Sequence, residues 1–138
     1  MSTSLTARLE LVAGAQCVLG TVDFTPLDLF MFSAAGWHPH RIHFDVPYAQ
    51  SEGHRGLVVH GPLQAVHLFQ ALAAALPDGA RVTGARYRHK QPLYLGTPAT
   101  MYAAVTAVDG ASGSVDVWFA DDNGATTTSG AAAVTVAS

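Results

Sequence analysis

The stretch Gly61-Pro-Leu-Gln-Ala-Val-His-Leu-Phe-Gln-Ala-Leu-Ala-Ala-Ala-Leu-Pro77 decides the fold of this 138-residue chain. A proline in its second position suits the first turn of a helix, and the sequence Pro77-Asp78-Gly79 ends that helix. Apolar residues recur between these two signals at helical spacing, at Leu63, Val66, Phe69, Leu72 and Ala73. Because few polar side chains interrupt the run (Gln64, His67 and Gln70), we predict a long helix that is mostly buried.

The sequence after this helix alternates between apolar and polar residues with the period of two that strands show. One face of the first run carries Ala85, Tyr87 and His89, and the other face carries Arg86, Arg88 and Lys90. Similar runs cover residues 101–105, 115–119 and 132–136, and the turns expected between them contain Asp109-Gly110 and Asn123-Gly124. We predict a single α+β domain over residues 1–138, in which the long helix is followed by three or four antiparallel strands that wrap around it as a single sheet layer.

The sequence before the long helix contains one clear helix start. Thr25 suits the N-cap position, Pro26 the first helical position, and Asp28 a returning hydrogen bond of the capping-box kind. We therefore predict a short helix from residue 26 to about residue 36. Residues 37–45 contain a proline and many polar rings, and we predict a loop or a short extended segment there. A short strand is expected nearer the N-terminus, at Leu9, Leu11 and Val12.

The composition excludes several classes of protein. Charged residues make up 12% of the chain, about half the usual share, and apolar residues 49%, which argues against intrinsic disorder. A net charge of −3 with seven Lys and Arg residues lacks the basic excess of nucleic-acid-binding proteins. The apolar runs are too short to span a bilayer, and Arg8 and Glu10 do not fit a signal peptide. With Cys17 as its only cysteine, the chain is expected to be soluble, reduced and cytoplasmic.

Three histidines fall within six positions, and an aspartate follows them: His38, His40, His43 and Asp45. The simplest interpretation is a solvated loop. A His-x-His pair followed by a carboxylate also fits a metal site of the cupin kind, because imidazole binds zinc and iron. The binuclear zinc hydrolase pattern His-x-His-x-Asp-His fails at Ile42, where it requires aspartate. No second group of ligands follows, so we predict no metal at these residues.

The segment Gly56-Leu-Val-Val-His-Gly-Pro-Leu63 joins a short apolar strand to the start of the long helix. It can be an ordinary Gly-Pro helix start. A helix N-terminus also presents unpaired N–H groups and the positive end of the helix dipole. Pro62 has no N–H, so the donors for an anion or an oxyanion would be Gly61 and Leu63.

Taken together, these two segments resemble a known family. The block from Leu29 to Asp45, followed by Gly56 to Leu63, resembles the MaoC-like hot-dog hydratases, in particular the mesaconyl-CoA hydratase and type-2 hydroxyacyl-thioester dehydratase branch. The run Arg88-His-Lys-Gln-Pro-Leu-Tyr-Leu-Gly96 resembles a strand of that branch, with Lys90 in place of an arginine. The resemblance covers roughly residues 25–110. It implies a hot-dog fold, in which a curved antiparallel sheet wraps around one central helix.

The resemblance also implies roles for individual residues. The family carries a Gly-Asp-x-Asn-Pro-x-His-x-Asp loop whose first Asp and His hold the water that adds to a 2-enoyl thioester. His43 and Asp45 match its His and final Asp, but His38 stands where the catalytic aspartate is expected. We expect His43 and His38 to be catalytic, Gly61 and His60 to bind the substrate or its oxyanion, and Asp45 to anchor the loop. Without the carboxylate, nothing in the sequence fixes the tautomer of His43.

The expected activity is that of an enoyl-thioester hydratase or 3-hydroxyacyl-thioester dehydratase without a metal or redox cofactor. Coenzyme A or phosphopantetheine would be part of the substrate. Two alternatives stay open: a hot-dog thioesterase, and a non-catalytic subunit that binds acyl thioesters or completes a partner's site. The low charge and the many small residues of 98–138 favour a homodimer or a higher even oligomer, and a second hot-dog chain is the alternative partner. Neither a nucleic acid nor a membrane is expected as a partner.

Overall fold

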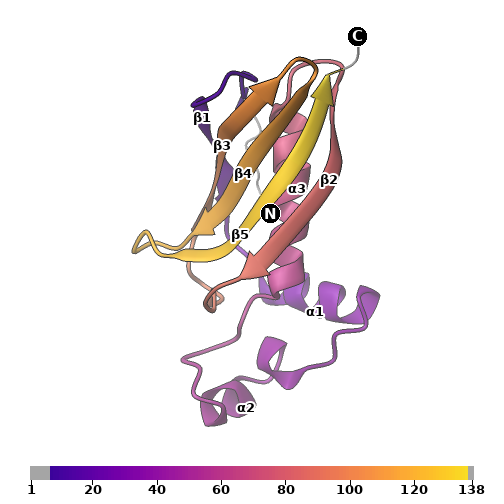
Figure 1. The fold of residues 1–138 in the computed structure, drawn as a ribbon. Helices are drawn as coiled ribbons and strands as arrows, with labels where there is room; N and C mark the ends of the chain where they lie inside the picture. The colour runs from indigo at the N-terminus through magenta and orange to yellow at the C-terminus, as the bar shows by residue number, and fades with distance from the viewer. Residues whose placement is uncertain (1–6, 137–138) are drawn as a thin grey trace.

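The computed structural model describes residues 7–136, which form an antiparallel five-stranded sheet curved around one long helix (Figure 1). The sheet contains β1 (Gln16–Val22), β2 (Ala80–His89), β3 (Ala99–Asp109), β4 (Ser112–Ala120) and β5 (Thr126–Val136). The strand order is β1-β3-β4-β5-β2, so β1 and β2 are the edge strands. The helices are α1 (Pro26–Ala35), α2 (Val46–Ser51) and α3 (Gly61–Ala75), with a 3₁₀ turn at Arg41–His43. The predicted arrangement of one curved sheet around one helix is confirmed.

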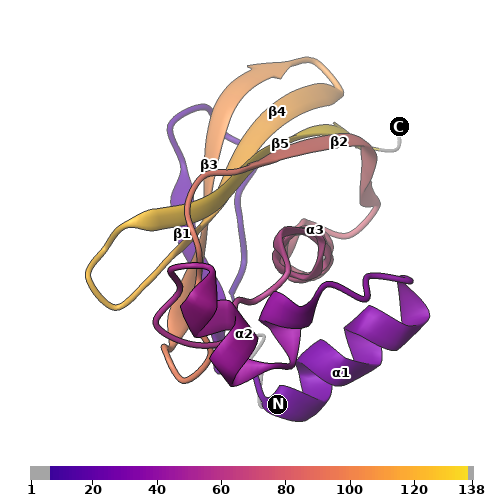
Figure 2. The same ribbon diagram turned by 90° about the horizontal axis from the view of Figure 1, so that it is seen from below.

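Helix α3 lies in the concave side of the sheet and forms the centre of the core (Figure 2). It begins at Gly61 and ends before Pro77, as predicted. Its buried face differs in part from the predicted one, because Val66 and Ala73 are exposed and line an open groove beside β2. Gln64 is fully buried, and it accepts a hydrogen bond from the Thr127 hydroxyl at 2.8 Å. The core is completed by the alternating inward residues of β3 and β4: Ala99, Met101, Ala103, Val105, Val115, Val117 and Phe119.

The strand predicted at Leu9, Leu11 and Val12 is wrong, because these residues precede β1 without joining the sheet. Leu9 is nevertheless in the core, and its N–H donates to the carbonyl of Ala75 at the end of α3. A turn at Gly14, where φ is +90°, then leads into β1. The hairpins predicted at Asp109-Gly110 and Asn123-Gly124 are confirmed, with positive φ at both glycines.

The segment between β1 and α3 packs at one end of the sheet (Figures 1 and 2). Helix α1 begins with the predicted capping box, in which the Thr25 hydroxyl accepts from the Asp28 N–H and Asp28 accepts from the Thr25 N–H. The prediction of a loop or extended segment at residues 37–45 is wrong in part, because the chain turns through the 3₁₀ turn there. The side chain of His40 caps this turn by accepting the Ile42 N–H at 3.3 Å. None of the helices in residues 7–136 has the length and apolar character needed to span a membrane.

Candidate active site

The segment that leads to α3 is held in place by the segment after β2. The Val59 N–H donates to the Leu93 carbonyl at 2.8 Å, and the Leu95 N–H donates to the Leu57 carbonyl at 2.9 Å. Tyr94 lies between these two bonds, and its ring stacks under the Arg55 guanidinium at 4.8 Å. These contacts join residues that are far apart in the sequence, and they fix the position of the residues at the start of α3.

His43 lies on the 3₁₀ turn and is fixed by the backbone of Val58. Its Nδ1 lies 2.6 Å from the Val58 carbonyl oxygen, and the Val58 N–H donates to the Ile42 carbonyl at 3.0 Å. A carbonyl oxygen accepts and never donates, so Nδ1 carries the proton and Nε2 of neutral His43 is the free base. The sequence offered no group to fix this tautomer, and the structure shows that a backbone carbonyl does so in place of a carboxylate.

His60 lies directly against His43. The two imidazole rings stack with their centroids 3.6 Å apart and their planes 20° apart. His60 is 2% exposed, and its Nε2 shares a 2.8 Å hydrogen bond with the Ser33 hydroxyl of α1. Its Nδ1 is also buried and has no hydrogen-bond partner within residues 7–136. An unpaired buried polar atom is costly, so this atom marks a place where a ligand or water can bind.

Burial and neighbouring imidazoles keep both rings neutral. Burial, and then the proximity of His43 and His38, lowers the pKa of His60 to about 4. The pKa of His43 is also lowered, chiefly by burial and further by His40, His38 and His54, although the bond to Val58 opposes the shift. His43 is therefore unprotonated at neutral pH and able to accept a proton at Nε2.

His38 and His40 complete the cluster from its solvent side, where both are exposed. The ring of His38 stacks on Phe32 of α1 at 5.8 Å and lies edge-on to His60 at 6.1 Å. The ring of His40 lies 6.2 Å from that of His43. Within residues 7–136, no three side chains of His, Cys, Asp or Glu are arranged to hold a metal ion.

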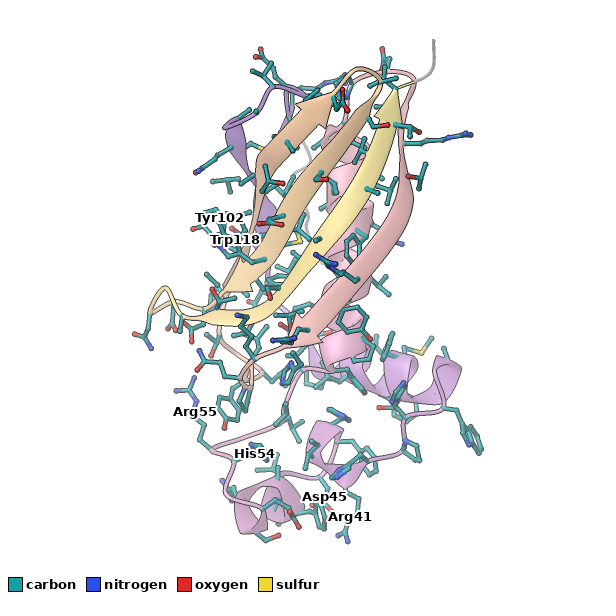
Figure 3. All side chains as sticks on the ribbon, in the orientation of Figure 1. Arg41, Asp45, His54, Arg55, Tyr102 and Trp118 are labelled. Atoms are coloured by element: carbon teal, nitrogen blue, oxygen red, sulfur yellow. The ribbon has the colours of Figure 1, made fainter. Side chains whose placement is uncertain are left out.

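Asp45 anchors the loop, as predicted. It is the N-cap of α2, where it accepts the Tyr48 N–H, and it accepts two hydrogen bonds from Arg41 at 3.0 and 2.7 Å. The hydrogen bonds from Arg41, and then the one from the Tyr48 N–H, hold the pKa of this carboxyl below its ordinary value. Figure 3 shows Arg41 and Asp45 beside each other at the end of the α1–α2 segment. Since its lone pairs are engaged in these bonds, Asp45 is poorly suited to act as a base.

Gly61 follows His60 directly and is the first residue of α3. Its N–H has no acceptor within residues 7–136, which leaves a free donor at the positive end of the helix. The structure therefore places the predicted residues His38, His43, His60 and Gly61 together at the start of α3.

Three participants in the site were missed from the sequence. Ser33 holds His60, Val58 holds His43, and His89 at the end of β2 packs against Gly61. A signal for Ser33 was present, because it is the one hydroxyl residue in the otherwise apolar stretch of α1. Val58 gave no signal, since it acts through its backbone carbonyl.

Residues 10–95, more than half of the chain, match the family profile described as hydroxyacyl-thioester dehydratase type 2. The chain belongs to this family. The chain is also similar to the mesaconyl-C(4)-CoA hydratase of Chloroflexus aurantiacus, with 42% identity over 87 residues, which are 62% of this chain. The matched part is 30% of that relative, so this family member spans less than a third of the relative's length.

Solved structures show the fold of this family member. The (R)-hydratase from A. caviae involved in PHA biosynthesis superposes with a TM-score of 0.84 and 24% identity, over 93% of this chain and 98% of that one. The ChsH1–ChsH2 complex from Mycobacterium tuberculosis contains a chain with a TM-score of 0.81 and 18% identity, covering 93% of this chain and 100% of that one. The hot-dog fold implied by the resemblance is confirmed.

Proposed function

We propose that this member of the hydroxyacyl-thioester dehydratase type 2 family is an enoyl-thioester hydratase and 3-hydroxyacyl-thioester dehydratase. The observation that carries the proposal is the free Nε2 of His43, whose tautomer is set by the Val58 carbonyl, close to the start of α3. A fixed base and a free N–H at a helix N-terminus are the two parts that water addition to an enoyl thioester needs.

In the hydration direction, Nε2 of His43 takes a proton from water as the water oxygen forms a bond to C3. The electron pair of the C2–C3 double bond moves toward the carbonyl, and negative charge develops on the thioester oxygen. The proton on the imidazolium of His43 then passes to C2, which closes the balance of atoms and charge. Dehydration is the reverse. General acid–base help of this kind contributes a factor of about 10² to 10⁴.

The Gly61 N–H is proposed to stabilise the thioester oxyanion, which a single donor achieves by about 3 kcal/mol in other enzymes. His60 is proposed to border the same pocket, with its unpartnered Nδ1 available to accept a hydrogen bond from the substrate or from the reacting water. His38, at the position of the family's aspartate, is proposed as a second acid–base group, since it lies beside His60 and is open to solvent.

The proposed substrate is an acyl thioester of coenzyme A or of a carrier protein, and the name of the mesaconyl-C(4)-CoA hydratase relative supports the first of these. We propose no metal or redox cofactor, because the thioester itself activates C3 for attack by water. The cytoplasm is the proposed compartment, consistent with a lone free cysteine, Cys17.

The proposed assembly is a homodimer formed through the edge strand β2. Residues 83–89 of this strand are exposed. The free edge of β2 can pair with a second β2 to make one continuous sheet. An open apolar groove of about 560 Å³ runs beside it between α3 and β2, lined by Val66, Phe69, Ala73 and Tyr87 among others. Such a groove is large enough to bury side chains of a second subunit. Light scattering at micromolar concentration is expected to give twice the mass of the chain, and a stable, active monomer would contradict this assembly.

A second candidate is a subunit that completes the site of another hot-dog chain. One observation favours it: among residues 7–136, no carboxylate contributes to the cluster around His43. Copurification with a second hot-dog chain that restores activity, when this chain alone is inactive, would support it over the homodimeric enzyme.

The direct experiment is to incubate the purified protein with crotonyl-CoA and follow the loss of enoyl-thioester absorbance. The reverse reaction, with 3-hydroxybutyryl-CoA, is expected to produce that absorbance. A His43→Ala variant is the matched control, because it removes the base while leaving Val58 and the fold in place. No turnover in either direction, with the folded protein at micromolar concentration, would overturn the proposal.

A further inference from the structure

We propose that His89, at the end of β2, is a catalytic residue that donates a second hydrogen bond to the thioester oxygen beside the Gly61 N–H. The inference rests on the proposed hydratase and dehydratase function and assigns a role to a residue that the sequence did not single out. It starts from the contact between the end of β2 and the start of α3, which lie at the same end of the sheet (Figure 1).

The imidazole of His89 fills the space beside the Gly61 Cα. A Cβ built on Gly61 would lie 3.2 Å from Nδ1 of His89 and 3.4 Å from its Cβ and Cγ. A side chain at position 61 would therefore press against this ring. Glycine at the start of α3 allows His89 to sit directly against the N-terminal turn of the helix.

The N-terminus of α3 has fewer donors than an ordinary helix start. Pro62 has no N–H, so the first two residues of the helix supply one donor instead of two. An oxyanion is usually held by two donors, one of which is often a side chain. The N-cap residue His60 is not the second donor in this proposal, because its Nε2 is bonded to Ser33 and its Nδ1 is proposed to accept a hydrogen bond. The unpartnered Nδ1 independently marks this helix end as a place for a polar ligand.

The hydrogen bond between His89 and Thr128 leaves one ring nitrogen of His89 free. Its Nδ1 lies 3.4 Å from the Thr128 hydroxyl and faces the positive end of α3. As part of the proposal we assign the Thr128 hydroxyl as the donor to Nδ1, because an N–H on Nδ1 would lie against the positive end of the helix dipole; the proton of the neutral ring is then on Nε2. Nε2 has no hydrogen-bond partner within residues 7–136. Burial lowers the pKa of His89, so the ring is neutral near pH 7, and a neutral imidazole can donate to a developing oxyanion.

The test compares His89→Leu, which removes the donor, with His89→Gln, which keeps an N–H donor on a side chain of similar reach. Arg88→Gln is the control, since neighbouring residues of a strand face opposite sides of the sheet. With crotonyl-CoA we expect His89→Leu to lower kcat by about 10²-fold with KM changed less than threefold. His89→Gln is expected to recover at least about tenfold of that loss, and Arg88→Gln to match the wild type. Circular dichroism and melting temperature check that each variant is folded.

A second readout does not depend on turnover. The carbonyl stretch of bound, ¹³C-labelled butyryl-CoA is expected to shift to lower frequency in the wild type, and part of the shift is expected to be lost in His89→Leu. An active wild type with a His89→Leu variant whose kcat stays within threefold and whose carbonyl stretch is unchanged would overturn the role of His89 alone. A folded wild type that neither turns over nor shifts the carbonyl would overturn the proposed function as well.

Discussion

Acidification is expected to destabilise this protein through His60, and the structure gives the size of the effect. The ring is 2% exposed, and its pKa is lowered to about 4 from the ordinary value of 6.5. Between these values the unfolded chain binds a proton at His60 that the folded chain does not, so the free energy of unfolding falls as the pH falls. At about 1.4 kcal/mol for each pH unit, the loss attributable to His60 between pH 7.5 and pH 4 is about 3 kcal/mol.

Other groups with shifted pKa values also change the stability on acidification. The pKa values of His43, His67 and His89 are also lowered, so these side chains contribute losses of the same sign in the same window. The pKa of Asp45 is lowered from 3.8, so its stabilising contribution is present above that value and is lost only below it, outside the window. Comparing the wild type with one His60 variant cancels the contributions of His67, His89 and Asp45 and leaves the contribution of His60 together with its coupling to His43.

The variant is His60→Phe, which keeps an aromatic ring against His43 and removes the titrating nitrogens. Urea unfolding followed by circular dichroism at pH 7.5, 6, 5 and 4 gives the free energy of unfolding of both proteins at one fixed protein concentration. We expect the wild type to lose about 3 kcal/mol more than His60→Phe across this range. If both proteins lose the same amount within about 0.5 kcal/mol, His60 is not held neutral by burial and our account of the stacked pair is wrong.

His43→Ala is expected to abolish turnover of crotonyl-CoA with an unchanged circular dichroism spectrum, because it removes the base; activity within threefold of the wild type would remove His43 from the mechanism. In the wild type, kcat/KM is expected to fall as the pH drops through a value below 6.5, because the proton-free form of His43 is the active one and its pKa is lowered. A pH profile without this acid limb would contradict that. His38→Asp is expected to retain or raise activity by restoring the family's carboxylate, and a large loss in a steady-state assay would show that the imidazole of His38 has a role of its own. Elemental analysis is expected to find less than one metal ion per chain, and one zinc or iron per chain with activity lost on chelation would restore the metal-site interpretation.

The sequence by itself determined the elements whose signals are local. The capping box at Thr25, the bounds of α3 between Gly61 and Pro77, and the glycine turns at Gly110 and Gly124 depend on residues within a few positions of one another. The same is true of Asp45, whose partners Arg41 and Tyr48 are four and three residues away. Short-range signals were less reliable at Leu9, where an apolar run packs into the core without joining the sheet.

Only the tertiary structure decided how the site is assembled. His43 and Val58 are fifteen residues apart, and the bond between them involves a backbone carbonyl, which any residue type supplies equally. Ser33 and His60 are 27 residues apart, and the end of β2 reaches Gly61 only because the sheet curves around α3. Side-chain identity in the sequence shows which groups are available for chemistry. Which nitrogen of each imidazole carries the proton, and which ring lies against which, follows from contacts between distant segments that exist only once the chain has folded.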